Sequence, residues 1–176
     1  DIGVMNSFGY LMANEKYGAS AKLKVIRHGV EYYQGQIIAH VDSGIKSVKD
    51  LEGKKFAFTD PSSTSGYMFP LKIMMDNNVN LGNQTFAIKH DNVVTMVYQK
   101  QVDAGATYYS APSEDGKIRD ARDRVKTQFP DVEDKVKIVT ITEKIPNDPF
   151  VFRKDLPQEV TDKFIAAVKK YIKTEN

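Results

Sequence analysis

Cysteine is absent from the 176 residues of this chain. Thiol catalysis, disulfide bonds and cysteine-ligated metal sites are therefore excluded, whereas a location outside the cytoplasm stays open. Long apolar runs are missing too, since no stretch approaches the roughly 18 residues that a membrane-spanning helix needs. Lysine and arginine (25) nearly balance aspartate and glutamate (23) and are spread along the chain. That balance argues against a nucleic-acid-binding surface, which concentrates basic side chains on one face.

Histidine is scarce, and His28, His40 and His90 do not have metal-ligand spacing. A glycine-rich phosphate loop ending in Lys-Ser or Lys-Thr is also missing, and no nucleophile stands beside a recognisable base. These absences argue against a hydrolase or transferase acting on phosphate esters. We therefore predict a protein that is not an enzyme and that uses neither a metal nor a cofactor.

The first residues, Asp1-Ile2-Gly3, read as if already inside a strand, with no initiator methionine, signal peptide or lipidated cysteine ahead of them. We expect the chain to be a piece of a longer protein whose targeting signals lie outside it.

Short apolar segments alternate with helical patterns, which predicts an α/β architecture with a largely parallel sheet. Expected strands cover residues 2–5, 23–26, 36–41, 54–59, 85–89, 102–107, 136–141 and 150–152. Expected helices cover residues 8–17, 47–53, 67–75, 91–101 (capped by Asp91 or Asn92), 117–129 (charged and solvated) and a final amphipathic helix. The apolar face of that last helix is expected to be Val160, Phe164, Ala167, Val168 and Tyr171.

Three hydroxyls, those of Ser63, Thr64 and Ser65, occur where a predicted strand turns into a helix. The first backbone N–H groups of a helix have no internal partner and its dipole is positive there, so this turn can hold an oxyanion with neutral donors. Gly66 lets a ligand approach the backbone closely. The alternative is that one serine is only an ordinary N-cap.

Ligands of open α/β sheets bind at the carboxyl ends of strands. Four loops are expected at such ends, namely residues 6–7, 32–33, 63–65 and 108–110. They are rich in hydroxyls and poor in acid–base pairs, which favours holding a small oxyanion over transforming one.

The segment Asp60-Pro61-Ser62-Ser63-Thr64-Ser65-Gly66-Tyr67, followed by Pro70, resembles the solute-binding proteins of phosphonate and phosphite ABC transporters. The similarity runs through nearly the whole chain in order. Supporting matches are Tyr32-Tyr33-Gln34-Gly35-Gln36, Asp42-Ser43-Gly44-Ile45, Lys49-Asp50-Leu51-Glu52-Gly53-Lys54, His90, Gln101-Val102-Asp103, and Ile145-Pro146-Asn147-Asp148-Pro149 with Arg153-Lys154.

The resemblance implies a type II periplasmic-binding fold, in which two Rossmann-like lobes joined by a hinge close on the ligand. Residues 35–142 would form lobe 2, and residues 1–34 and 143–176 would be parts of an incomplete lobe 1. Members of the family normally have a further strand–helix–strand unit, with another ligand-facing aromatic, ahead of the position of Asp1.

Carried over residue by residue, the resemblance implies that Ser63, Thr64 and Ser65 hold the phosphonate oxygens. Tyr33 would reach the ligand from the hinge side, or else pack at the lobe junction. His90 matches a ligand-proximal histidine, although a loop histidine bonded to backbone is the simpler interpretation. Asp148 would face an ammonium or a P–OH group, unless it is only a turn aspartate before proline.

One departure concerns members that take aminophosphonates, which carry a second acid just after the strand matching residues 102–107. Here those positions are Tyr108-Tyr109-Ser110, with Tyr109 expected to occupy that space. The pattern favours phosphite or a short alkylphosphonate over 2-aminoethylphosphonate.

As a transporter component the protein would work outside the cytoplasmic membrane, periplasmic or lipid-anchored, with ABC permease subunits as partners and no nucleic acid. The alternative is a ligand-sensing input domain of a receptor or regulator, because the same lobes serve in both.

Overall fold

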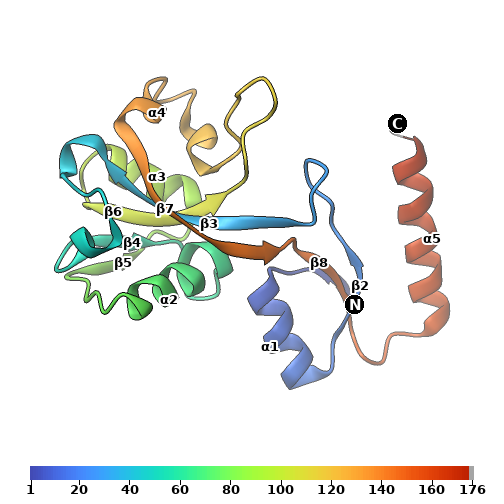
Figure 1. The fold of residues 1–176 in the computed structure, drawn as a ribbon. Helices are drawn as coiled ribbons and strands as arrows, with labels where there is room; N and C mark the ends of the chain where they lie inside the picture. Colours follow the sequence, from blue (N-terminus) through green and yellow to red (C-terminus); the bar gives the residue numbers. More distant parts are fainter. Residues whose placement is uncertain (175–176) are drawn as a thin grey trace. The chain divides into compact units, whose positions relative to one another are not determined.

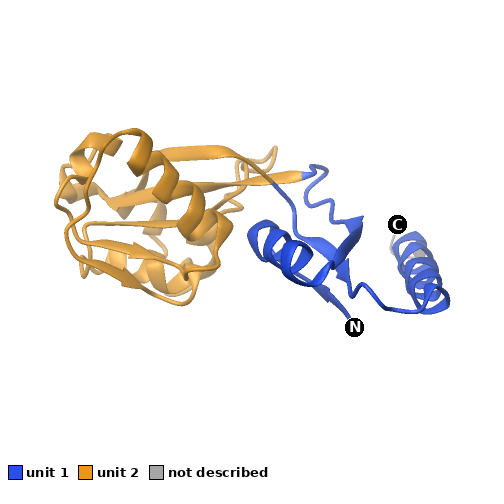
Figure 2. Ribbon diagram, turned by 90° about the horizontal axis from the view of Figure 1, so that it is seen from below, with its two compact units in different colours: residues 1–31, 146–176 blue, residues 32–145 orange. Residues whose placement is uncertain are grey.

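The computed structural model describes residues 1–174, which divide into two compact units. Unit 1 combines Asp1–Glu31 with Pro146–Asn176, and unit 2 is the continuous segment Tyr32–Ile145 (Figure 2). The expected lobe boundaries, after residues 34 and 142, lie close to these limits. Their assignment to the two lobes of a larger protein stays a prediction.

Unit 2 is built on a five-stranded sheet in the order β5-β4-β6-β3-β7 (Figure 1). Its strands are β3 (Tyr32–His40), β4 (Phe56–Phe58), β5 (Gln84–Phe86), β6 (Ala104–Tyr109) and β7 (Val136–Pro146). β4 runs parallel to β5 and β6, whereas β3 is antiparallel to β6, with Ile37 opposite Ala106. The α/β class is confirmed. The expectation of a largely parallel sheet was wrong, because β3 enters the sheet from the opposite end.

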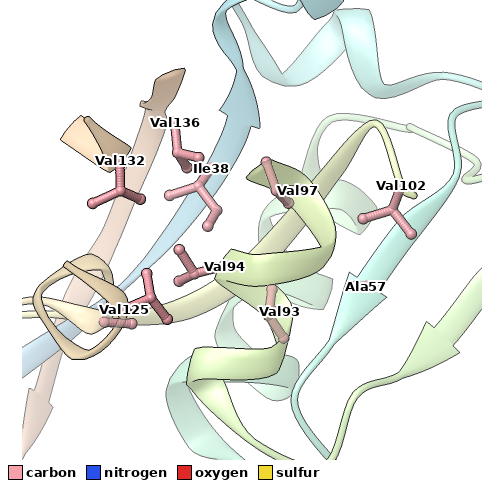
Figure 3. Packing of buried hydrophobic residues seen from close by; sticks show 10 residues of the cluster. Ile38, Ala57, Val93, Val94, Val97, Val102, Val125, Val132 and Val136 are labelled. Atoms are coloured by element: carbon pink, nitrogen blue, oxygen red, sulfur yellow. The ribbon is translucent and has the colours of Figure 1, made fainter. Parts of the chain in front are cut away.

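Helices cover both faces of this sheet. They are α2 (Phe69–Asp76), α3 (His90–Tyr98) and α4 (Val132–Lys135), with shorter helical turns at η1 (Val41–Ser43), η2 (Val48–Leu51), η3 (Thr64–Met68) and η4 (Ala121–Val125). Ile37 and Ile38 belong to different hydrophobic clusters. Successive strand residues point to opposite faces, so each cluster fills one face. Figure 3 shows the cluster in which Val94 and Val97 of α3 lie against Ile38.

The charged, solvated helix expected at residues 117–129 is wrong. Only the single 3₁₀ helix η4 forms there, and its Arg122 is buried. The Arg122 guanidinium donates to both carboxylate oxygens of buried Asp120 (3.0 and 2.8 Å) and to the Val136 carbonyl (3.0 Å). Two of the charges that indicated an exposed helix, those of Asp120 and Arg122, are therefore paired inside the unit.

Three smaller expectations also change. Tyr32 and Tyr33 lie inside β3, not in the turn before it, and Tyr108 and Tyr109 lie inside β6. α3 begins at His90, so Asp91 and Asn92 lie inside its first turn and do not cap it, and the residue in the cap position, Lys89, makes no side-chain cap. The Asn92 amide instead donates back to the Ala87 carbonyl (2.8 Å).

Unit 1 contains an antiparallel sheet in the order β1-β8-β2, formed by β1 (Ile2–Val4), β8 (Pro149–Phe152) and β2 (Ser20–Lys24). The helix α1 (Ser7–Tyr17) is capped at its start by Asn6, whose side chain accepts from the Gly9 N–H, and at its end by Gly18 in the left-handed conformation that glycine favours.

The last helix, α5 (Gln158–Thr174), forms as expected but does not have the expected burial. Phe164 packs on Phe150 and Phe152, with ring centroids 5.7 and 5.5 Å apart. Val160 and Tyr171, expected to face inward, are 44% and 61% exposed. An apolar face is buried only where a second layer covers it, and within unit 1 that layer reaches Phe164 alone among these three.

Candidate functional site

The Ser-Thr-Ser turn joins β4 to the helical segment formed by η3 and α2. Asp60 organises its start, since Asp60 Oδ1 accepts from the N–H and the hydroxyl of Ser62 (2.9 and 2.6 Å). The Ser63 hydroxyl then accepts from the Gly66 N–H at 3.0 Å, as an N-cap does. η3 is one wide turn in which the Met68 N–H donates to the Ser63 carbonyl. The helix therefore begins at Thr64, three residues earlier than expected.

The three hydroxyl residues are buried but are not equivalent. The hydroxyl of Ser63 is used by the cap. Ser65 is 2% exposed, and its hydroxyl and backbone N–H make no hydrogen bond within residues 1–174. The fully enclosed side-chain atom without a partner among the described residues is Gln36 Oε1, so the Ser65 hydroxyl is still open to a small ligand. Buried polar groups are normally paired, so Ser65 offers two donors to a ligand.

Two glycines allow this turn to pack closely. A Cβ at Gly66 would lie 2.2 Å from the Thr59 hydroxyl oxygen, and a Cβ at Gly35 of β3 would lie 2.6 Å from the Ser65 carbonyl oxygen. Only glycine fits at either position, which places the turn directly against the sheet.

His90 stands at the first residue of α3, beside the same turn. Its Nδ1 lies 3.1 Å from the Thr59 hydroxyl oxygen, and its ring meets the Tyr108 ring edge to face at 5.0 Å. Burial, and next the charge of Arg124, lower the pKa of His90 to about 4, although Asp60 and Asp91 act in the opposite direction. The imidazole is therefore neutral near pH 7.

Arg124 supplies a positive charge next to this group. Its Nε donates to the Tyr108 hydroxyl (3.0 Å), and its guanidinium lies over the Tyr108 ring at 5.4 Å. The side chain comes from η4, the segment for which the sequence predicted a plain solvated helix.

Tyr33 and Tyr109 come from neighbouring strands. β3 and β6 pair with Gln34 opposite Tyr109, so Tyr33 is one residue beyond that pair. Both strands contact η3. Tyr33 stands near the amino end of β3, not at a carboxyl end as expected. Because β3 is antiparallel to β6, it still lies at the edge of the sheet where β6 ends.

Asp148 belongs to unit 1, whereas the other six predicted site residues belong to unit 2. Burial raises the pKa of the Asp148 carboxyl, opposed by the positive charge of Arg27. Its neighbour Asn147 is buried and donates to the Val25 and Val30 carbonyls (3.0 and 2.8 Å). These bonds tie the loop that carries Asp148 to the segment after β2.

Sequence reasoning missed Thr59, Tyr108 as a partner of His90, and Arg124. A threonine at the end of a strand that leads into a hydroxyl-rich turn was an available signal for Thr59. Arg124 had no such signal, because its contact with Tyr108 joins segments 16 residues apart in sequence.

A family model described as "ABC transporter, phosphonate, periplasmic substrate-binding protein" matches residues 1–176. The chain belongs to this phosphonate-binding family.

Two individual proteins of the phosphonate-binding family are similar to most of this chain. The "Phosphonates-binding periplasmic protein" of Escherichia coli (strain K12) is 29% identical over 157 residues, covering 85% of this chain and 44% of that protein. The binding protein component of an ABC phosphonate transporter from Pseudomonas aeruginosa has a TM-score of 0.74 at 25% identity, covering 94% of this chain and 55% of that chain.

The fold also matches PhnD1 from Prochlorococcus marinus in complex with methylphosphonate, with a TM-score of 0.68 at 16% identity, over 88% of this chain and 57% of that one. The type II periplasmic-binding fold is confirmed by such neighbours. The chain spans about half the length of the relatives it matches.

Within residues 1–174, none of the helices combines the length and apolar character that crossing a bilayer requires, and no three or more His, Cys, Asp or Glu side chains are grouped so that they could bind a metal ion.

Proposed function

We propose that this chain belongs to the extracytoplasmic solute-binding component of an ABC importer and captures a small phosphorus oxyanion at the Ser-Thr-Ser turn. The observation that carries the proposal is Ser65, a buried residue whose hydroxyl and N–H have no partner among residues 1–174. Family membership supplies the ligand class, and the turn supplies the donors.

The electrostatics of unit 2 support an anion held mainly by neutral donors. The ligand oxygens take hydrogen bonds from Ser65 and Thr64 at the start of a helix that continues through α2, where the dipole is positive. His90 is neutral, so it contributes a hydrogen-bonding group without a charge. Arg124 adds a positive charge beyond Tyr108, which draws anions toward this edge of the sheet.

The ligand is small and lacks an ammonium group. Tyr108 and Tyr109 of β6 stand where aminophosphonate-binding members carry a second acid, and no carboxylate replaces it at Ser110. Asp148 of unit 1 stays a predicted ligand residue, and burial raises the pKa of its carboxyl, which lessens its repulsion of an anion. Phosphite or a short alkylphosphonate meets these conditions, with permease subunits of the importer as partners of the closed protein.

Isothermal titration of the full-length gene product with phosphite, methylphosphonate, 2-aminoethylphosphonate and phosphate tests this function. Uptake requires an affinity near or below micromolar, roughly −8 kcal/mol. We expect phosphite or methylphosphonate to bind best, and Thr64→Ala combined with Ser65→Ala to abolish the heat. Tighter binding of 2-aminoethylphosphonate would overturn the ligand preference. No heat with any of the four would remove the oxyanion assignment and leave the sensing domain as the better explanation.

A further inference from the structure

Thr59, the residue after β4, makes two contacts through one hydroxyl group. Its Oγ1 lies 3.2 Å from the Ala106 carbonyl oxygen and 3.1 Å from Nδ1 of His90. A hydroxyl has a single hydrogen, and a carbonyl oxygen can only accept. Both contacts are hydrogen bonds only if Thr59 donates to Ala106 and accepts from a protonated Nδ1. The opposite arrangement would leave two oxygen lone pairs facing each other in a buried place, which is costly.

The surrounding residues hold the hydrogen bonds of Thr59 to Ala106 and His90 in place. Thr59 is 3% exposed, and its backbone N–H donates to the Gly66 carbonyl (3.1 Å). The Tyr108 ring fixes the plane of the imidazole from β6. The charged groups that act on His90 are Arg124 from η4, Asp60 from the turn and Asp91 from α3. With the ring neutral near pH 7, one nitrogen carries a hydrogen and the other a lone pair.

We propose that Thr59 is a positioning residue that keeps His90 in the Nδ1–H tautomer, so that Nε2 presents a lone pair to the bound oxyanion. Within the described residues Nε2 has no hydrogen-bond partner. The part of this inference that concerns a ligand rests on the proposed function.

The tautomer determines which ionic form of the ligand is bound. A lone pair on Nε2 repels an unprotonated phosphonate oxygen and accepts a hydrogen bond from a P–OH group. Ser65 offers hydrogen-bond donors instead of an acceptor, because its N–H and its hydroxyl can both donate. The two sides of the site therefore select a singly protonated monoanion, with its P–OH on His90 and its unprotonated oxygens on the turn.

Long-range ¹H–¹⁵N spectra of the ligand-free, full-length gene product near pH 7 test the tautomer without reference to any ligand. We expect a protonated Nδ1 and an unprotonated Nε2 for His90, identified by the loss of its signals in His90→Gln. Thr59→Val should shift the pattern toward the other tautomer, and Thr59→Ser, which keeps the hydroxyl, should restore it. An Nε2–H signal in the wild type, or an unchanged pattern in Thr59→Val, would overturn the inference.

Thr107→Val is the matched control for a buried threonine. Its hydroxyl accepts from the Gln36 amide (3.1 Å) in the same sheet, and among the described residues no hydrogen bond joins it to His90. It should lose a comparable hydrogen bond and leave the tautomer unchanged. A change in the tautomer in this variant too would show that general loosening of the sheet, not Thr59, sets the ring state.

Titration with methylphosphonate over a range of pH tests the ligand part. Affinity should fall by up to tenfold per pH unit above the second ionisation of the ligand, and Thr59→Val should flatten this dependence. Equal affinity for both ionic forms in the wild type would overturn the selection of the monoanion. It would not affect the tautomer, which the ¹H–¹⁵N spectra test separately. Absence of binding at every pH would instead overturn the proposed function, so the two failures are distinguishable.

Discussion

Ser63 and Ser65 are two residues apart, yet their hydroxyls have different hydrogen-bond environments. Ser63 caps the helix, whereas Ser65 is buried without a partner among residues 1–174. Ser63→Ala should therefore lower the free energy of unfolding by about 1 kcal/mol. Ser65→Ala should leave unfolding nearly unchanged and weaken oxyanion binding by about tenfold or more, a loss of one hydrogen bond to a charged group. Urea unfolding and titration calorimetry on both variants check this, and a destabilised Ser65→Ala would contradict it.

At His90 the lowered pKa makes stability depend on pH. The pKa is about 4 in the folded chain against 6.5 for the ordinary value, so between these pH values the unfolded chain binds more protons. The stabilisation is fully present above pH 6.5 and is lost as the pH falls toward 4, by at most about 3 kcal/mol. Urea unfolding at pH 7.5 and pH 4.5 should show a smaller difference for His90→Asn than for the wild type. Equal differences would mean that His90 titrates normally.

At the scale of elements, η4 illustrates how a tertiary environment overrides a local pattern. The charges of residues 117–129 suggest a solvated helix, but Asp120 and Arg122 form a buried pair that the Val136 carbonyl completes. The segment adopts the conformation that makes these hydrogen bonds. Leaving either charge buried without its partner would lose more free energy of folding than a helix with exposed charges would gain.

Arg122→Met is expected to destabilise the protein by about 3–5 kcal/mol, since it leaves the Asp120 carboxylate buried without its partner. Lys126→Met is the matched control, because its ion pair with Glu133 (2.6 Å) is about 40% exposed on both sides and should contribute less than about 1 kcal/mol. Thermal unfolding of both variants measures the difference between their losses of stability. Similar effects would show that the buried pair has no special role.

Two glycines at the Ser-Thr-Ser turn determine how closely the neighbouring elements pack. A strand, a turn and a helix meet within van der Waals distance only because Gly66 and Gly35 lack a Cβ. That Gly66 lets a ligand approach stays a prediction, and the structure adds that the close contact with Thr59 also requires glycine there.

On the scale of the whole molecule, the two units differ in how much core they have. Among residues 1–174, both hydrophobic clusters lie wholly inside unit 2, whereas unit 1 buries few apolar side chains, among them Val151 and Phe152. Several of its large apolar side chains are exposed, including Leu11 (61%) and Val4 (54%).

We therefore expect residues 32–145, a continuous segment, to fold alone with cooperative unfolding. Hydrogen exchange on the 176-residue chain should show the strongest protection in β3, β4 and β6 and much weaker protection in α1 and α5, since protection follows local burial and contact density. Equal protection of α1 and β6 would contradict this division.

By itself the sequence determined the α/β class, the family, the position of the Ser-Thr-Ser turn at a strand–helix junction and most strand locations. These features depend on local periodicity, turn residues and a contiguous motif, all of which neighbouring residues encode. The roles of the seven predicted site residues stay predictions.

Only the tertiary structure decided the antiparallel direction of β3, the burial of Arg122, and the contact that joins Thr59 to His90. Each depends on segments far apart in the chain, and no local pattern specifies which distant group will satisfy a buried polar atom. The exposure of Val160 and Tyr171 belongs with these, because an amphipathic pattern marks the apolar face of a helix and not the layer that covers it.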